Sequence, residues 1–235
     1  MQMLPGTGPA EDDLYEIYQL TYAHDPGRRV HDNFILRDMH DGPMPVDFNL
    51  WILRNAHRII LVDTGFSPRA AAERKRPLDI DPVEALARIG VDPDTVEDVV
   101  ITHLHFDHAG NLDRFGKARF HIQDAEVAFA TGRCMCDAFI RRPFDVEDVV
   151  TLVRHTYANI LNMKPFNLTV DVPATLDTYR RAMALAGAPH RFIPGHDPKA
   201  RRLFPTIEVN GIALLALHEE PAAHQTSDLM RTDNF

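Results

Sequence analysis

Four side chains of the metal-ligand type fall within six consecutive residues of this chain, in the segment His103-x-His105-x-Asp107-His108. The segment directly follows residues 99–102, a short apolar run typical of a strand buried on both faces. Alternate residues of an extended segment point to the same side, so His103 and His105 can converge on one point, with Asp107 and His108 at the following turn. Imidazole and carboxylate groups suit Zn²⁺, Fe²⁺ or Mn²⁺, and this density favours a metal site over a polar loop with locally bonded histidines.

Composition and charge exclude several other classes of function. The 235 residues include 25 Lys+Arg and 34 Asp+Glu, a formal net charge of −9, which argues against a nucleic acid or an anionic membrane as partner. Residues 1–13 lack the pattern of a secretory signal, and no apolar run approaches the length of a membrane span. Cys134 and Cys136 are too close in sequence for a good disulfide. We therefore expect a cytoplasmic protein.

Hydrophobic patterning predicts a mixed α/β architecture in layers. Because no repeat or linker is evident, we expect a loose tail over residues 1–14 and a single domain over 15–235. Helices are predicted at 82–89 with Asp81 as N-cap, from Asp124 to 131 with Asp124 as cap, at 145–155 and at 174–186. Strands are predicted at 15–22, 48–53 and 58–62 as a hairpin, 99–102, 118–122 and 191–193, with 212–217 as a strand or a packing segment.

Two further motifs stand in order around the histidine-rich segment: Leu-Val-Asp-Thr-Gly at 61–65 and Pro-Gly-His-Asp at 194–197. With the HxHxDH signature they make the sequence similar to the metallo-β-lactamase-fold superfamily of metal-dependent hydrolases. Within it the chain most resembles the N-acyl-homoserine lactonase-like branch, on the residues of 102–112, 119–126 and 193–198.

The resemblance implies an αβ/βα four-layer sandwich that holds two metal ions. By the family's pattern, His103 and His105 would ligate the first metal, and the second would be held by Asp107, His108 and His196. Asp63 would orient the metal loop from outside the ligand shell. The cofactor expected is zinc, as one or two ions, with iron or manganese as alternatives.

The sequence departs from the family's pattern between residues 123 and 194. The pattern requires a histidine in a Gly-His turn and an aspartate that bridges both metals, and we find neither; the only histidines of the interval are His155 and His190. Residues 145–154 resemble the helix before the expected hairpins, and 155–166 the segment after the bridging aspartate. Relative to the length expected for the family, we therefore expect roughly 40 residues to be absent near 150–157, which predicts an incomplete second sheet. An exposed sheet edge would offer a place for a second copy, so a homodimer is one expectation.

The implied activity is the opening of a lactone or related ester, a small-molecule substrate, by attack of a metal-bound hydroxide. Asp107 would orient the water or move a proton to the leaving oxygen. His155 and Tyr157 lie where relatives place a polar group near that oxygen, although a helix-surface or core-edge position is an equal alternative.

Two other functions stay open at this point. One is a degenerate, catalytically impaired homologue with an incomplete dinuclear site; the other is thioester hydrolysis of the glyoxalase II kind. With two ligands missing, we expect any retained metal to prefer the site of Asp107, His108 and His196 and to bind more weakly than in full-length relatives. Phe48, Trp51 and Phe106 are candidates either for an acyl pocket or for ordinary core.

Overall fold

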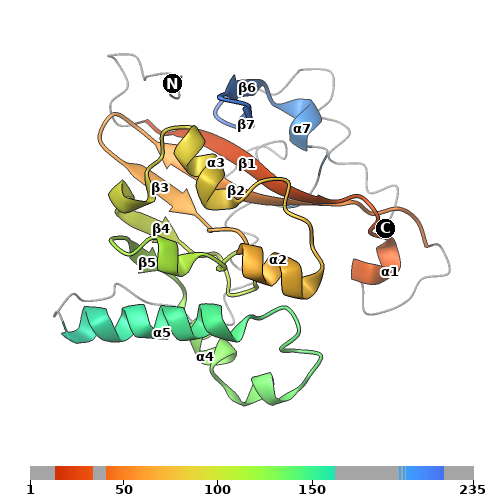
Figure 1. The fold of residues 1–235 in the computed structure, drawn as a ribbon, viewed down its shortest axis with the longest axis vertical. Coiled ribbons are helices and arrows are strands. Elements are labelled where there is room, and N and C mark those ends of the chain that lie inside the picture. The colour runs from red at the N-terminus through yellow and green to blue at the C-terminus, as the bar shows by residue number, and fades with distance from the viewer. Residues whose placement is uncertain (1–13, 34–40, 162–195, 197, 199, 220–235) are drawn as a thin grey trace.

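A single mixed sheet organises the described part of the chain, which in this computed structural model is residues 14–33, 41–161, 196, 198 and 200–219. Its seven strands lie in the order β5-β4-β3-β2-β1-β7-β6 (Figure 1). The pairs β3–β4 and β4–β5 are parallel and the other neighbouring pairs are antiparallel. The strands are β1 (Glu16–Asp25), β2 (Val46–Arg54), β3 (Ile59–Val62), β4 (Asp98–Val100), β5 (Arg119–His121), β6 (Thr206–Val209) and β7 (Ile212–Ala216).

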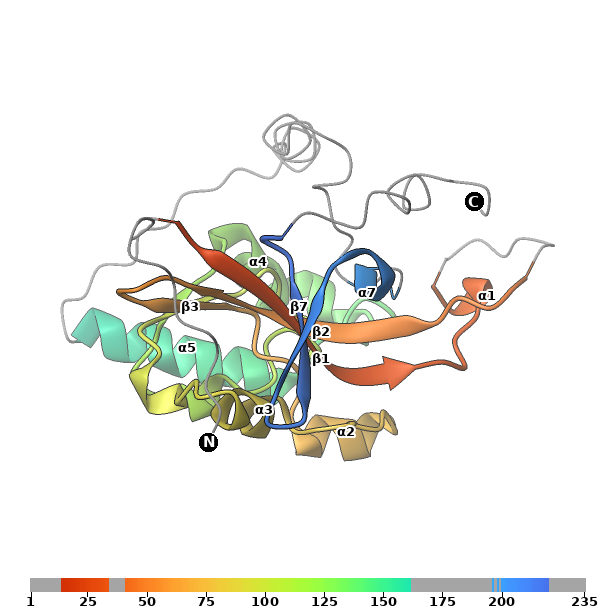
Figure 2. The ribbon, with the colours of Figure 1, turned by 90° about the horizontal axis from the view of Figure 1, so that it is seen from above.

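Helices lie against this sheet and beside its β5 edge. Figures 1 and 2 show α2 and α3 on the same face of the sheet, while α5 lies next to β5. The α-helices are α1 (Val30–Asn33), α2 (Pro68–Arg74), α3 (Pro82–Arg88), α4 (Asp124–Ala130), α5 (Val146–Leu161) and α7 (Ala200–Leu203). Short 3₁₀ turns are η1 (Pro93–Thr95), η2 (Leu112–Arg114) and η3 (Arg133–Cys136).

The core fills the space between the sheet and the helices that cover it. Leu20 of β1 stands opposite Leu50 of β2, and both side chains are fully buried. Val99 of β4 and Leu86 of α3 belong to the same buried cluster. Burial of such side chains stabilises the fold by about 1.5–3 kcal/mol each. The core therefore fixes the carboxyl ends of β3 and β4, where the histidine-rich loop begins.

Most of the predicted elements are present, with small shifts at their ends. The hairpin, the strands around residues 15–22, 99–102 and 118–122, and the strand over 212–217 are confirmed. Asp81 caps α3 as predicted, because its carboxylate accepts the N–H groups of Val83 and Glu84 at 2.8 and 3.1 Å. The predicted cap of α4 is wrong by one residue: Asp124 lies in the first turn and Gln123 occupies the N-cap position. The expected helix 174–186 and strand 191–193 lie outside the described residues.

Helices α1, α2 and α7, strand β6 and the three 3₁₀ turns were not predicted. Helix α2 begins after Ser67, whose hydroxyl accepts the Ala70 N–H, with a proline in the first turn; this Ser-Pro pair is a usable start signal. Strand β6 pairs with β7 at the sheet edge through a turn at Asn210 and Gly211, both with positive φ.

Of the four layers expected, the described residues form one sheet and the helices packed against it. Within the described residues all strands belong to this sheet, so the mixed α/β class is confirmed and a second sheet is not among them. The division into a tail over 1–14 and one domain over 15–235 stays a prediction. In the described part of the chain, no helix combines the length and apolar character that crossing a bilayer requires.

Candidate metal centre

Asp63 holds the start and the end of the histidine-rich loop together. It follows β3, is fully buried and has φ of 64°, a left-handed conformation that aspartate tolerates better than most residues. Its Oδ1 accepts the Thr102 N–H at 2.8 Å, and its Oδ2 lies 2.7 Å from Nδ1 of His108. The Thr64 N–H also donates to the carbonyl of His108 at 2.7 Å. Asp63 thus contacts the histidine-rich loop near both of its ends, next to the place where the family resemblance implies that it orients the loop.

Gly110 closes the loop by a close backbone approach. Its N–H donates to the carbonyl of Gly65 at 2.8 Å. A Cβ at this position would lie 2.7 Å from that carbonyl oxygen, 2.7 Å from Cα of Phe66 and 2.8 Å from the carbonyl oxygen of Phe106. Because all three atoms are backbone, glycine is required for the loop to seat against the turn after β3. The position of His108 depends on this contact.

Three of the predicted ligands converge at the loop. Asp107, His108 and His196 each offer one ligand atom, and these atoms all lie within 4.8 Å of one another. Nε2 of His108 lies 3.2 Å from Nε2 of His196 and 3.4 Å from Oδ2 of Asp107. His196 comes from a segment 88 residues further along the chain. The fold therefore assembles this group from two distant parts of the sequence.

The two imidazoles are oriented so that both Nε2 atoms face the same point. Nδ1 of His108 faces the carboxylate of Asp63, and Nδ1 of His196 lies 2.9 Å from the carbonyl oxygen of Asp47. Since both partners are acceptors, each Nδ1 carries a proton, and in the neutral ring each Nε2 presents a lone pair. Two facing lone pairs repel unless a proton or a cation lies between them.

The spacing of these atoms fits a divalent metal. Two ligands on one tetrahedral zinc ion, each about 2.0–2.1 Å from it, lie about 3.3–3.4 Å apart. The observed separations of 3.2 and 3.4 Å match this value. Two imidazoles, a carboxylate and hydrogen-bonded outer partners are also the donor set that zinc accepts. The residues present therefore fit the metal that the sequence predicts.

The pKa values of His108 and Asp107 are coupled to each other. Burial by itself lowers the pKa of His108, but the carboxylates of Asp107 and Asp63 outweigh burial and raise that pKa to about 9. Burial would raise the pKa of Asp107, yet the hydrogen bond and charge of His108 hold it below its usual range. A metal and the proton of His108 thus compete for one position.

His103 and His105 lie beside this group but form no three-residue ligand group of their own among the described residues. The His103 ring centroid is 3.9 Å from that of His108 and 4.4 Å from that of His105. Burial, followed by the neighbouring histidines, lowers the pKa of His103 to about 3, and burial lowers that of His105. Both rings are therefore neutral and capable of ligation, yet within the described ranges neither ring has a hydrogen bond to a carboxylate that would orient it.

The two other predicted catalytic residues lie on α5. His155 packs its ring against Phe120 of β5, with 5.0 Å between centroids, and burial lowers its pKa. In the part of the chain that the structure describes, it makes no hydrogen bond or ring contact with the ligand group, so the structure does not bring it to the site. Tyr157 belongs to the same helix, but its side chain lies outside what is described.

The sequence did not predict that Asp47 positions His196. The Asp47 N–H faces the carbonyl of His196 at 3.4 Å, in addition to the contact between the Asp47 carbonyl and the ring. The Asp47 carboxylate is buried and forms an ion pair with Arg201 of α7 at 2.5 Å. Contacts made by backbone atoms do not depend on residue type, so the sequence does not reveal them. The pairing of Asp47 with Arg201 could not be predicted either, because it depends on the fold.

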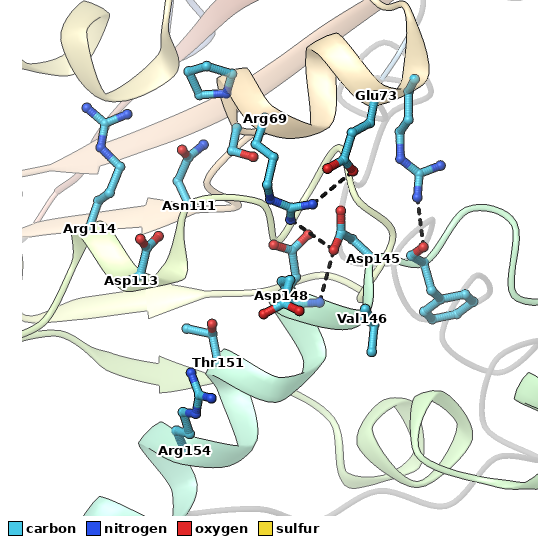
Figure 3. Close-up of a pocket in the computed structure, with 15 residues that line it drawn as sticks. Arg69, Glu73, Asn111, Asp113, Arg114, Asp145, Val146, Asp148, Thr151 and Arg154 are labelled. Carbon is cyan, nitrogen blue, oxygen red and sulfur yellow. Dashed lines mark hydrogen bonds and ion pairs between the residues drawn. The ribbon is translucent and has the colours of Figure 1, made fainter.

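A separate hollow of about 1040 Å³ lies between α2, η2 and α5 (Figure 3). Arg69 lies between Glu73 and Asp145, with ion pairs of 2.9 and 3.0 Å. Asp148 is buried, and its Oδ2 has no hydrogen-bond partner among the described residues. Burial, and then the charge of Asp145, raises the pKa of Asp148 to about 8. None of the predicted metal ligands lines this hollow.

Comparison with known protein families assigns the chain to a superfamily. The profile of the metallo-beta-lactamase superfamily matches residues 45–196, a span that includes all five predicted ligands. The chain belongs to the metallo-beta-lactamase superfamily. The resemblance seen in the sequence is thereby confirmed, and Asp63, Asp107, His108 and His196 lie within the matched part of the superfamily domain.

Curated relatives and solved structures also match parts of the chain. The chain is 27% identical over 132 residues to an N-acyl homoserine lactonase AiiB of Agrobacterium fabrum and to one of Rhizobium rhizogenes, in each case over 44% of this chain and 48% of the relative. It thus spans about half the length of the curated relatives it matches. A quorum-quenching N-acyl homoserine lactone lactonase matches with a TM-score of 0.45 and 21% identity, over 64% of this chain and 55% of that one. AidC, a dizinc quorum-quenching lactonase, matches with a TM-score of 0.43 and 17% identity, over 72% and 60%.

Proposed function

We propose that the chain is a metal-dependent hydrolase that opens a lactone or a related ester with one divalent cation, zinc in the first place. Asp107, His108 and His196 would hold the cation. The observation that carries the proposal is the pair of Nε2 atoms 3.2 Å apart, each on a ring whose Nδ1 faces an acceptor. Membership of the metallo-beta-lactamase superfamily and the lactonase relatives support the class of reaction.

When bound, the cation supplies a Lewis acid that polarises a carbonyl group and acidifies water. Asp63 and the carbonyl of Asp47 keep the two imidazoles in the tautomer that presents Nε2. Asp107 takes a proton from the attacking water and passes it to the leaving oxygen. In the net reaction the oxygen of water bonds to the acyl carbon, the C–O bond to the leaving oxygen breaks, and that oxygen gains the proton.

Roles near the leaving oxygen stay predictions. The contact of His155 with Phe120 favours packing of α5 on the sheet as the function of that ring. Tyr157 remains a candidate on the grounds of sequence alone. A cytoplasmic location, a homodimer and the absence of nucleic-acid or membrane partners are likewise expectations from the sequence.

Metal content and chelator-sensitive hydrolysis test the proposal together. Purified protein is expected to retain zinc and to hydrolyse a simple γ-lactone or an aryl ester, with loss of activity in a chelator and recovery on addition of zinc. His196→Ala is expected to lose both properties, whereas His57→Gln, a change at an exposed turn histidine, keeps both. Zinc-free protein without chelator-sensitive hydrolysis would contradict the proposal and favour an impaired homologue. Hydrolysis confined to thioesters would favour chemistry of the glyoxalase II kind.

A further inference from the structure

A hollow of about 1120 Å³ reaches the candidate metal centre on the side of Asp107. Phe48 of β2 and Phe106 of the histidine-rich loop are among the residues that line it. Phe48 also packs against the ring of His196, with 6.2 Å between centroids. One ring of the aromatic wall thus packs against His196 of the ligand group, and Asp107 of that group also lines the hollow. A molecule bound here would have its apolar part beside the candidate metal centre.

Arginines line the same hollow, and Arg74 is placed closest to its aromatic wall. Its guanidinium lies 4.2 Å from the centre of the Phe106 ring. It donates to the carbonyl oxygens of Arg142 and Phe144 at 2.8 and 2.7 Å. Carbonyl groups and a ring hold this side chain in position without neutralising it. No carboxylate lies within ion-pair distance of Arg74 in the described ranges.

Two further arginines of the hollow have unused donors. Nε of Arg28 is buried and has no hydrogen-bond partner among the residues described, while its Nη2 donates to the carbonyl of Asp32 at 3.3 Å. Arg142 is exposed, and across the described chain its guanidinium makes no ion pair. A buried N–H without a partner destabilises the protein, and a ligand that accepts a hydrogen bond from it would remove this penalty.

The carboxylates that line the hollow are already engaged. Asp25 forms an ion pair with Arg76, and Asp107 faces His108. Asp32 accepts the backbone N–H of Arg29. Four arginines and three aspartates line the hollow, which gives it a formal charge of +1 on a chain whose formal net charge is −9. Such a local field favours an anionic ligand over a neutral one of the same size.

From this arrangement we infer a substrate class: an ester or lactone that carries a carboxylate, joined to the scissile carbonyl by a short apolar chain. The inference rests on the proposed function. The apolar chain lies along Phe48 and Phe106. The carboxylate accepts hydrogen bonds from the arginines, whose planar guanidinium groups match the geometry of a carboxylate. Hydrolysis proceeds with the same bond changes as above and leaves the distal carboxylate unchanged.

A matched pair of substrates tests the inference. Mono-4-nitrophenyl glutarate carries a free carboxylate, and its methyl ester is the same molecule without that charge. In low salt we expect kcat/KM for nitrophenolate release to favour the anion by about 10-fold or more, as a charge-assisted hydrogen bond implies. Arg142→Gln is expected to remove most of this preference while sparing hydrolysis of the methyl ester. Arg88→Gln, which alters an arginine of α3 paired with Glu84, leaves the preference intact.

Binding to metal-free protein separates this inference from the proposed function. Calorimetry with glutarate is expected to show binding that Arg142→Gln and 0.5 M NaCl weaken by about 10-fold. Equal kcat/KM for the two esters, with no effect of Arg142→Gln, would overturn the inference and leave the hydrolase proposal standing. Hydrolysis of neither ester would contradict the proposed function, and glutarate binding that depends on Arg142 would then still support the anion site. Absence of glutarate binding to the metal-free protein would count against it.

Discussion

The histidine cluster has two halves that differ in how their rings are held. His108 and His196 each have an acceptor at Nδ1, from the Asp63 carboxylate and the Asp47 carbonyl. Nδ1 of His103 lies 3.0 Å from the hydroxyl of Thr102, and His105 packs its ring against Phe144; in the described part of the chain neither ring has a hydrogen bond to a carboxylate or a carbonyl group. All four histidines are predicted as metal ligands from the sequence. The comparison teaches that ligand type alone does not make a site, since the oriented half is the half whose atoms converge.

Removal of a ligand from the oriented half is expected to have the largest effect. His108→Ala and His196→Ala should each weaken zinc binding by more than about 100-fold, because even loss of an outer partner costs about 10–100-fold. His103→Ala should weaken it only a few-fold. Competition with a chromophoric zinc chelator measures all three affinities. The comparison breaks if His103→Ala abolishes binding while His196→Ala leaves it unchanged.

Loss of an orienting acceptor is expected to come next. Asp63→Asn keeps the shape of the side chain but replaces an acceptor oxygen by a donor amide in part of its contacts with Thr102 and His108. We expect zinc affinity to fall by about 10–100-fold with all ligands present. Asp94→Asn, at an exposed position of η1, serves as the control. Unchanged affinity in Asp63→Asn, measured by the same competition, would mean that the Asp63 contact does not prepare His108 for metal.

The seating of the loop should respond to a single added methyl group. Gly110→Ala places a Cβ 2.7 Å from backbone atoms of Gly65 and Phe66, whereas nothing lies within 4 Å of the corresponding position at Gly116. We expect Gly110→Ala to lower the free energy of unfolding by about 1–3 kcal/mol, and Gly116→Ala to change it far less. Urea unfolding compares the two variants. Equal stability of both would show that the close approach does not constrain the loop.

Asp148, a buried carboxyl group whose Oδ2 has no hydrogen-bond partner among the described residues, makes the stability of the fold depend on pH. The pKa of Asp148 is raised from 3.8 to about 8, so the folded protein binds this proton more tightly than the unfolded chain does. The stabilising contribution of the proton is present at low pH and is lost as pH rises toward 8. The free energy of unfolding should therefore fall between pH 4 and 8 more steeply in the wild type than in Asp148→Asn. Glu147→Gln, at the exposed neighbouring position, should keep the wild-type slope.

Much of the fold follows from local sequence. Alternating residues place the hairpin, and the Asp81-Pro82 pair begins α3 with the predicted cap. The motif of the histidine-rich loop and the turn at Asp63 are both local, but their pairing was expected only because the resemblance to the metallo-β-lactamase-fold superfamily implied it. The cap of α4 was misplaced because Gln123 and Asp124 are adjacent, and the cap position depends on a single residue's backbone conformation.

The contacts that complete the site could not be derived in this way. Asp47 holds His196 through backbone atoms, so no side-chain type marks it. Arg74 reaches carbonyls about 70 residues away, and its place over Phe106 depends on how α2 packs. Such contacts depend on tertiary arrangement, whereas the ligand motif depends on spacing along the chain.

Anomalous diffraction at the zinc absorption edge, from crystals grown with zinc, tests the central claim most directly. We expect one peak, about 2.0–2.1 Å from Nε2 of His108 and Nε2 of His196 and close to Oδ2 of Asp107. A peak held by His103 and His105, with none between His108 and His196, would contradict the account.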